Sequence, residues 1–280
     1  MLSLVLLASL AVEPLRKTPD PVFTLRVLTY NIQGLPNDDE SSHERYGRIG
    51  KILKERRDAG AAPHVVFIQE AFHPRTQELI EEAGYPHHRF GAPGHSGAPL
   101  SSGLVILSEF PIERAATIDY VGCTGFDCWA NKGAQHARLL IPGLPVPLDV
   151  FNTHMNAGDE EHNRDVRKQQ LKQLLPFIKA HRGAGSPALM SGDFNFRRGD
   201  SDYALFTAGA NAAESCAQHG CEGAADPLAI ARESVDHHFY ARGERVDARP
   251  TRFEQTFTEE PPLSDHVGLE AWFTLASDGR

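Results

Sequence analysis

Carboxylate, amide and histidine side chains recur along this chain where short apolar segments end. The set comprises Asn31, Glu70, His154, Asp193 with Asn195, Asp236, and Asp265 with His266. One polar residue at such a point is normally a solvated turn residue. Six such points in succession, all of types that bind metals or transfer protons, favour a shared site over independent turns.

Three of these residues offer oxygen donors for a metal ion. Glu70, Asn31 and Asp265 present carboxylate and amide oxygens, which are the hard ligands that Mg²⁺ and Ca²⁺ prefer. Mg²⁺ is usually held by one or two carboxylates and completed by water and a substrate phosphate, so few protein ligands are needed. The sequence therefore predicts a divalent-cation site, for Mg²⁺ or for another divalent cation such as Mn²⁺ or Ca²⁺.

The remaining residues could move protons and hold a phosphate. We expect His266 to act as a general base, with Asp236 orienting one of its ring nitrogens and favouring its charged form. His154 would supply a second donor towards the leaving oxygen or the phosphate. Asp193 could position the attacking water, and Asn195 could donate to the phosphoryl oxygens as charge builds. Together these residues predict metal-assisted hydrolysis of a phosphoester.

Length and composition indicate one globular domain with a net negative charge. The chain has 280 residues, 41% apolar and 23% charged, with a formal charge of −9 and a pI near 5.9. This balance argues against nucleic-acid binding through a broad basic surface. It does not exclude an enzyme that meets phosphate through a metal ion, because the ion supplies local positive charge.

Hydrophobic periodicity predicts alternating strands and helices that bring the polar residues together. Helices are expected over residues 42–60, 75–83 and 162–181. Strands are expected over residues 24–33, 64–70, 103–108, 138–141, 148–154, 188–195, 234–240 and 266–273. Residues 91–101 are predicted to be a loop and 207–233 to be irregular. Because ends of adjacent strands meet at one edge of a sheet, we expect the polar residues to converge there.

Seven short segments carry a resemblance to a known superfamily. They are T-Y-N (29–31), Q-E (69–70), S-G-L-V-I-L-S (102–108), N-T-H (152–154), G-D-F-N (192–195), V-D-H (235–237) and S-D-H (264–266). Their order resembles that of the endonuclease/exonuclease/phosphatase superfamily over about residues 24–275. The resemblance implies an α+β, DNase I-like fold, a two-sheet β-sandwich flanked by helices, with one or two divalent metals at the edge of the sheets.

One segment narrows the resemblance to a single group within the superfamily. It covers residues 123–133 and reads C-T-G-F-D-C-W-A-N-K-G. It is similar to the cysteine-containing N-K-G segment of bacterial neutral sphingomyelinases. That similarity implies that Lys132 approaches the substrate phosphate; a solvent-facing lysine in a glycine turn is the alternative. One feature departs from the haemolytic sphingomyelinases, which carry an exposed aromatic hairpin. The only tryptophans here are Trp129 and Trp272, and no candidate hairpin is visible.

Three functions follow from these patterns. The first is a sphingomyelinase-like phospholipase C acting on a phosphodiester, with a lipid headgroup favoured over nucleic acid because of the N-K-G segment. The second is a DNase I-like endonuclease. The third is a non-catalytic binding domain on the same fold, which is disfavoured because Glu70, Asp193 and His266 are all retained. No protein partner is inferred.

The first residues are expected to form a leader. Residues 2–12 are an apolar run that is too short to span a bilayer, and Ser9-Leu10-Ala11 is a possible cleavage site. No Lys or Arg precedes the run, and the alternative is a first strand or helix of the fold. We therefore predict a signal peptide and leader over residues 1–22, one domain over 23–280, and a secreted or periplasmic location with no stable membrane span.

Four cysteines form two pairs with C-x₄-C spacing. They are Cys123 with Cys128 and Cys216 with Cys221. With a leader, two short disulfides are the expected arrangement. A zinc site is the rival, but no second ligand pair with suitable spacing follows. Free buried cysteines are the remaining alternative.

Overall fold

The computed structural model describes residues 21–36, 43–95, 97–215 and 234–277. The predicted leader lies almost wholly outside these residues. Cys216 and Cys221 also lie outside them, so their predicted disulfide stays a prediction.

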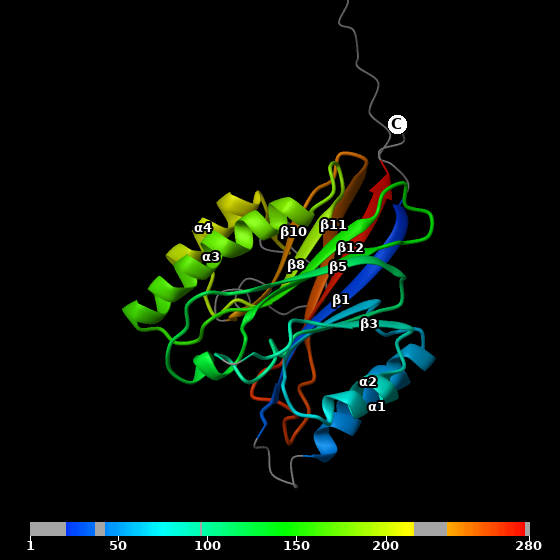
Figure 1. Cartoon of the computed structure of the whole chain (residues 1–280). Helices are drawn as coiled ribbons and strands as arrows, with labels where there is room; N and C mark the ends of the chain where they lie inside the picture. The colour runs from blue at the N-terminus through cyan, green and yellow to red at the C-terminus, as the bar shows by residue number, and fades with distance from the viewer. Residues whose placement is uncertain (1–20, 37–42, 96, 216–233, 278–280) are drawn as a thin grey trace, which may run out of the picture.

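Two six-stranded sheets form the centre of the molecule (Figure 1). The first sheet has the order β11-β12-β1-β2-β4-β3, with β11 Val246–Thr256, β12 Gly268–Ser277, β1 Pro21–Gly34, β2 Val65–Ala71, β4 Val105–Ser108 and β3 His87–Phe90. The second sheet has the order β5-β6-β7-β8-β10-β9, with β5 Ile112–Asp119, β6 Gly133–Leu139, β7 Leu148–His154, β8 Ala188–Asp193, β10 Asp236–Ala241 and β9 Ala213–Glu214. In each sheet one central pair is parallel, β1 with β2 and β7 with β8.

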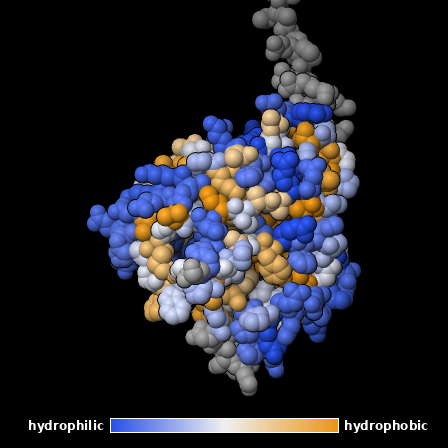
Figure 2. All heavy atoms as spheres, in the orientation of Figure 1, coloured by the Kyte–Doolittle hydropathy of each residue, from blue (hydrophilic) through white to orange (hydrophobic). Residues whose placement is uncertain are grey.

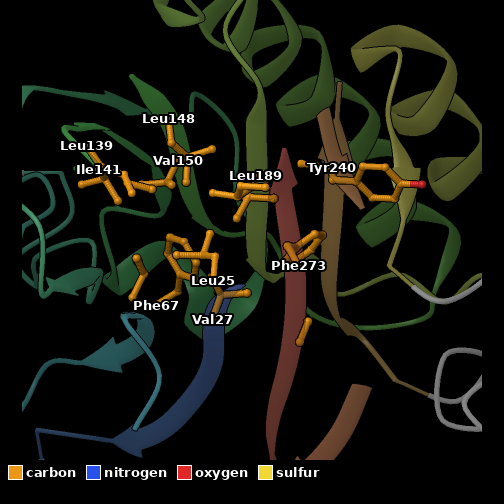
Figure 3. Close-up of a cluster of buried hydrophobic side chains, with 14 of the residues drawn as sticks. Leu25, Val27, Phe67, Leu139, Ile141, Leu148, Val150, Leu189, Tyr240 and Phe273 are labelled. Carbon is orange, nitrogen blue, oxygen red and sulfur yellow. The ribbon is translucent and has the colours of Figure 1, made fainter. Parts of the chain in front are cut away.

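The main core lies between the two sheets. Leu25 and Val27 of the first sheet share one buried cluster with Val150 and Leu189 of the second (Figure 3). Strand alternation turns the next residue, Leu28, to the opposite face, where it packs in a different cluster. Both faces of the central strands are therefore buried, which explains why these strands read as almost continuous apolar runs.

A pair of helices covers the outer face of each sheet (Figure 1). Helices α1 (Glu44–Asp58) and α2 (Thr76–Ala83) bury apolar residues against the outer face of the first sheet. Helices α3 (Glu161–His181) and α4 (Ser201–Ala210) do the same on the second sheet. A short 3₁₀ turn, η2, spans Gly125–Trp129. The predicted α+β sandwich of two sheets flanked by helices is confirmed.

The polar strand termini converge on one edge of the sandwich, which we call the rim. Strands β1, β2, β7 and β8 finish there, whereas β10 and β12 start there because they run antiparallel to their neighbours. Asp236 is therefore the first residue of its strand, and Asp265 and His266 precede theirs. The prediction that strands end at these residues was wrong in direction, but the antiparallel pairing brings them to the same edge. The register aligns His154, Asp193 and Asp236 side by side across β7, β8 and β10.

Several elements differ from the sequence-based expectation. Strand β3, which contains His87 and His88, was not predicted. Edge strand β5 and strand β11 were not predicted: β5 is largely exposed, and β11 changes register between Pro250 and Arg252. Residues 207–210 were predicted to be irregular but belong to helix α4. The pattern missed this helix because its apolar residues are spread around the helix with no clear face. Within the described residues, no helix is long and apolar enough to cross a membrane.

Candidate active site

The two sheets contribute jointly to a cluster of ionisable side chains at the rim. Glu70 is the penultimate residue of β2 in the first sheet, while His154 and Asp193 are the last residues of β7 and β8 in the second. One ligand atom of each lies within 4.8 Å of the others, and Asp193, Asp236 and His266 form a second such group. The shared residue is Asp193, so five of the predicted site residues form one continuous constellation.

The backbone at this edge is held in unusual conformations. Glu70 and Asn195 have positive φ values of 55° and 53°, although neither is glycine. Gly192, with φ at 137°, could not carry a side chain, because an added Cβ would lie 2.1 Å from the Thr153 carbonyl oxygen. Positive φ outside glycine costs about 1–3 kcal/mol and persists where surrounding structure enforces it. In this conformation the Glu70 carboxylate accepts from Asn31 and lies near Asp193 of the second sheet.

Asn31 bridges the two acidic groups of the first cluster. Its Nδ2 donates to Glu70 Oε1 at 2.9 Å and to Asp193 Oδ2 at 3.1 Å. Its Oδ1 accepts the Gln33 backbone N–H at 3.0 Å. Asn31 therefore occupies the predicted place, but as oriented it presents N–H groups to the cluster. To coordinate a cation through oxygen, the amide must rotate and give up the Gln33 hydrogen bond.

The charge balance of the cluster fits a divalent cation. Burial and the neighbouring Asp236 carboxylate raise the pKa of Asp193 to about 7. Asp236 Oδ1 is buried and has no hydrogen-bond partner among the described residues. Carboxylates that are crowded, buried and incompletely paired are costly unless a positive charge joins them. Glu70, Asp193 and His154 therefore suit a hard or borderline divalent ion, with Asn31 beside them.

His266 is tied directly to Asp236. Its Nδ1–H donates to Asp236 Oδ2 at 2.7 Å, and its Nε2 lies 4.0 Å from Asp193 Oδ2. Burial alone lowers the pKa of His266, but the hydrogen bond and charge of Asp236, with Asp193 and Asp265, raise that pKa to about 10. The predicted pairing of this histidine with Asp236 is present, and Nε2 faces the interior of the cluster.

His154 and Lys132 form a second histidine arrangement on the opposite side of Asp193. Lys132 Nζ donates to His154 Nε2 at 3.0 Å and to the Met155 carbonyl at 2.9 Å, and it pairs with Asp127 at 2.8 Å. Burial, followed by the charges of Lys132 and His266, holds the pKa of His154 well below its usual value. His154 is therefore neutral and accepts at Nε2, so its predicted donor role and the phosphate contact of Lys132 both need one of these bonds to be exchanged.

Two further predicted residues lie at the margin of the cluster. Asn195 donates from Nδ2 to the Met155 carbonyl at 2.9 Å, and its backbone N–H donates to Asp193 Oδ1 at 3.0 Å. One of its two amide hydrogens thus supports the backbone instead of facing the cluster. Asp265 is exposed, and it is not in either group of clustered ligand atoms. Its predicted role as a metal ligand stays a prediction.

A buried amide network beneath the cluster was not predicted. Gln69 Nε2 donates to Asn152 Oδ1 at 2.7 Å, and Asn152 Nδ2 donates to the carbonyls of Ile68 and Val105 at 3.0 and 3.1 Å. Gln69 also contacts Thr29. These bonds link the first sheet to β7 of the second. The sequence contained a sign of this network. In the Q-E segment the amide of Gln69 is next to Glu70, and in the N-T-H segment the amide of Asn152 is two residues before His154.

A disulfide-closed turn borders the cluster. Cys123 and Cys128 are bonded, which confirms one of the two predicted disulfides and excludes zinc or a free thiol at this pair. Asp127, inside the closed turn, pairs with Lys132 and accepts the Ala157 backbone N–H at 2.6 Å. This acidic residue was also missed, although it lies within the quoted C-T-G-F-D-C segment.

Comparison with known proteins connects this constellation to a family. A model of the endonuclease/exonuclease/phosphatase family matches residues 28–266. A sphingomyelinase of Mycobacterium tuberculosis is 29% identical over 275 residues, which cover 90% of this chain and 53% of the relative. Sphingomyelinase C of Bacillus cereus is 26% identical over 286 residues, covering 89% of this chain and 83% of the relative. This chain thus spans about half the length of the mycobacterial relative.

Solved structures share the fold. Sphingomyelinase C of Streptomyces griseocarneus superposes with a TM-score of 0.67 at 21% identity, covering 89% of this chain and 99% of the other. A beta toxin of Staphylococcus aureus, described with bound magnesium ions, gives a TM-score of 0.68 at 18% identity, covering 89% and 99%. At these identities the likeness supports the shared architecture and no more.

Proposed function

The chain belongs to the endonuclease/exonuclease/phosphatase family, and we propose that it is a metal-dependent phosphodiesterase that releases the phosphorylated headgroup of a phospholipid. The observation that carries this proposal is the continuous rim constellation in which Glu70 and His154 meet Asp193, and Asp193 meets Asp236 and His266. Such a set provides anionic ligands for a cation on one side and a carboxylate-oriented histidine on the other.

The residues divide into two groups by role. Glu70 and Asp193 would hold the cation, with His154 or a rotated Asn31 amide beside them and Asp265 as a further candidate on the exposed side. When bound, a divalent ion neutralises phosphate charge and lowers the pKa of a water molecule. Mg²⁺ is proposed because the donors are mainly oxygen, and Mn²⁺ or Ca²⁺ could replace it.

The chain's own groups then handle the water and the phosphate. His266 Nε2 would accept the proton of the attacking water, while Asp236 fixes the ring through Nδ1 and stabilises the imidazolium that forms. Asp193 would orient that water, and His154, which Lys132 bonds at Nε2, would supply the proton that the leaving lipid oxygen takes as its bond to phosphorus breaks. Lys132 and Asn195 would meet the phosphoryl oxygens, each by exchanging a present contact to the Met155 carbonyl.

Relatives named sphingomyelinase and phospholipase C support a phospholipid substrate over nucleic acid. The leader pattern and the Cys123–Cys128 disulfide support export, to the periplasm or outside the cell.

An activity panel tests the proposal. The purified chain would be assayed with Mg²⁺ on sphingomyelin, phosphatidylcholine, plasmid DNA and a phosphomonoester, each with and without excess EDTA. We expect EDTA-sensitive release of a phosphorylated headgroup from a phospholipid. Nicking of plasmid DNA without lipid hydrolysis would instead favour the endonuclease, and full activity in EDTA would contradict a metal-dependent site.

A further inference from the structure

The segment around the Cys123–Cys128 disulfide, beside the active site, exposes large apolar side chains to solvent. Phe126 is 93% exposed, Val121 is 77% exposed and Trp129 is 63% exposed. We call residues 121–129 the aromatic turn. Figure 2 shows orange and pale atoms projecting at the lower left, in the position that this green turn holds in Figure 1. Aromatic rings are normally buried, so two of them projecting from one short segment indicate a contact surface.

The backbone of the aromatic turn is held rigidly. The Cys123–Cys128 bond closes it, and the Thr124 N–H donates to Asn156 Oδ1 at 2.9 Å. The Val121 N–H and carbonyl both bond to the Gln173 side chain of α3, at 2.8 and 3.0 Å. The rings are therefore displayed on a fixed frame, and a partner that binds them need not order the loop first.

The aromatic turn is also connected to the active site. Asp127 lies between Phe126 and Trp129 and pairs with Lys132, which in turn donates to His154. Only two polar contacts thus separate the exposed rings from the rim cluster. A surface that binds the aromatic turn would therefore lie close to the rim cluster.

The size and charge of the turn identify the partner. A stable protein interface buries roughly 800 Å² on each side, which three side chains cannot supply. Residues 121–129 contain no Lys or Arg, and the chain carries a net charge of −9, so attraction to anionic lipid is not the driving force. Trp and Phe instead favour the boundary between headgroups and acyl chains.

We propose that the aromatic turn docks the enzyme on a zwitterionic phospholipid bilayer, with Phe126 and Trp129 inserted at the headgroup level. The inference rests on the proposed function in that the substrate is a lipid presented at a surface. The sequence offers no candidate aromatic hairpin for this task. The structure instead assigns membrane docking to the aromatic turn.

Vesicle binding tests the docking surface without catalysis. Sucrose-loaded phosphatidylcholine vesicles would be co-sedimented with wild type, Phe126→Ser, Trp129→Ser and the double variant, all in EDTA. We expect each single change to lower the partition coefficient about tenfold and the double change to lower it further. Phe126→Leu should retain most binding, and Leu205→Ser, which alters an exposed apolar residue on α4, should leave binding unchanged.

A second readout separates docking from catalysis. With Mg²⁺, the double variant should lose most hydrolysis of vesicle lipid while it keeps wild-type hydrolysis of a water-soluble chromogenic phosphodiester. Wild-type partition by the double variant would overturn the proposal, as would binding that needs anionic lipid and disappears in salt. Self-association in size-exclusion chromatography that the double variant abolishes would assign the turn to a second copy and overturn it too. Aromatic-dependent partition without hydrolysis of any substrate would uphold docking and refute the proposed function.

Discussion

At the scale of single residues, Glu70 is the side chain on which cation binding should depend most. It is the one clustered carboxylate from the first sheet, and one of its oxygens lies within 4.8 Å of a ligand atom of Asp193. Because Mg²⁺ sites use few protein ligands, Glu70→Gln should weaken Mg²⁺ binding by at least about tenfold. Isothermal titration of the metal-free protein measures this. Glu78→Gln, which changes an exposed carboxylate paired with Arg75, is the matched control and should bind as wild type does.

His266 gives a prediction about proton affinity. A general base needs a pKa near the working pH, yet the metal-free chain raises the pKa of His266 to about 10. Asp236→Asn removes the hydrogen bond and charge that raise this pKa, so the imidazole should titrate at lower pH. A cation bound at Asp193 should also lower the pKa of His266, and adding Mg²⁺ to the protein tests this. The titration can be followed by NMR, with buried His238, whose pKa lies at about 4, as an internal reference.

The same pair should have unequal effects on turnover. His266→Ala should lower kcat by roughly three orders of magnitude, because the base is lost. Asp236→Asn should cost less, since the ring remains but is poorly oriented. The pH–rate profiles at saturating Mg²⁺ distinguish the two variants. Near-wild-type turnover and an unchanged acidic limb in His266→Ala would show that another group is the base.

For single residues, the sequence predicted which side chains form the site better than it predicted their orientations and hydrogen-bond partners. Types and spacing identified Glu70, Asp193 and His266. They could not predict that the Asn31 amide faces its neighbours with nitrogen, or that all three Lys132 donors are engaged. Those details depend on hydrogen-bond partners that are distant in the chain and are fixed only by packing.

At the scale of elements, an acidic residue joins two strands and the end of a helix. Asp149 of β7 accepts from His136 and Arg138 of β6 at 2.8 and 2.9 Å, and from the Gly183 N–H beyond α3 at 2.7 Å. Burial alone raises the pKa of Asp149, but these hydrogen bonds outweigh burial and lower it. The stabilisation is thus present above the ordinary carboxyl pKa and is lost as pH falls through the lowered folded-state value.

Asp149→Asn should therefore destabilise the protein mainly at neutral pH. We expect a loss of about 2 kcal/mol near pH 7 that shrinks as pH falls through the lowered pKa of Asp149, where the wild-type carboxyl itself becomes protonated. Urea unfolding at several pH values measures the difference. Asp165→Asn, in an exposed pair with Lys168, should change stability little at any pH. A pH-independent loss in Asp149→Asn would contradict the electrostatic explanation.

Elements with strong periodicity were predictable, and those without it were not. The long helix α3 and the buried strands β2 and β7 follow clear patterns. Helix α4 and edge strand β5 owe their structure to neighbours, because α4 has no clear apolar face and β5 pairs along its length with β6. Local sequence does not contain that tertiary information.

At the scale of the whole molecule, the active site depends on how the two sheets are aligned. Glu70 comes from one sheet and Asp193 from the other, so a small shift between the sheets would separate them. Apolar packing in the core holds the sheets together but is not directional. The hydrogen bonds of Asn152 with Gln69 and with the Ile68 carbonyl are directional, and they cross between the sheets at positions one and two residues from Glu70 and two from His154.

Replacing the bridging amide should therefore impair both stability and the site. Asn152→Leu leaves buried polar groups on β2 and β4 without their partner, and we expect a loss of about 3 kcal/mol in the free energy of unfolding. Mg²⁺ affinity should also fall, although Asn152 is not among the clustered ligands, because Glu70 is no longer aligned with Asp193. Asn163→Leu is the matched control: it removes buried amide bonds around the start of α3, so it should lower stability but keep Mg²⁺ affinity. Equal loss of affinity in both variants would mean that general destabilisation, and not sheet alignment, controls the site.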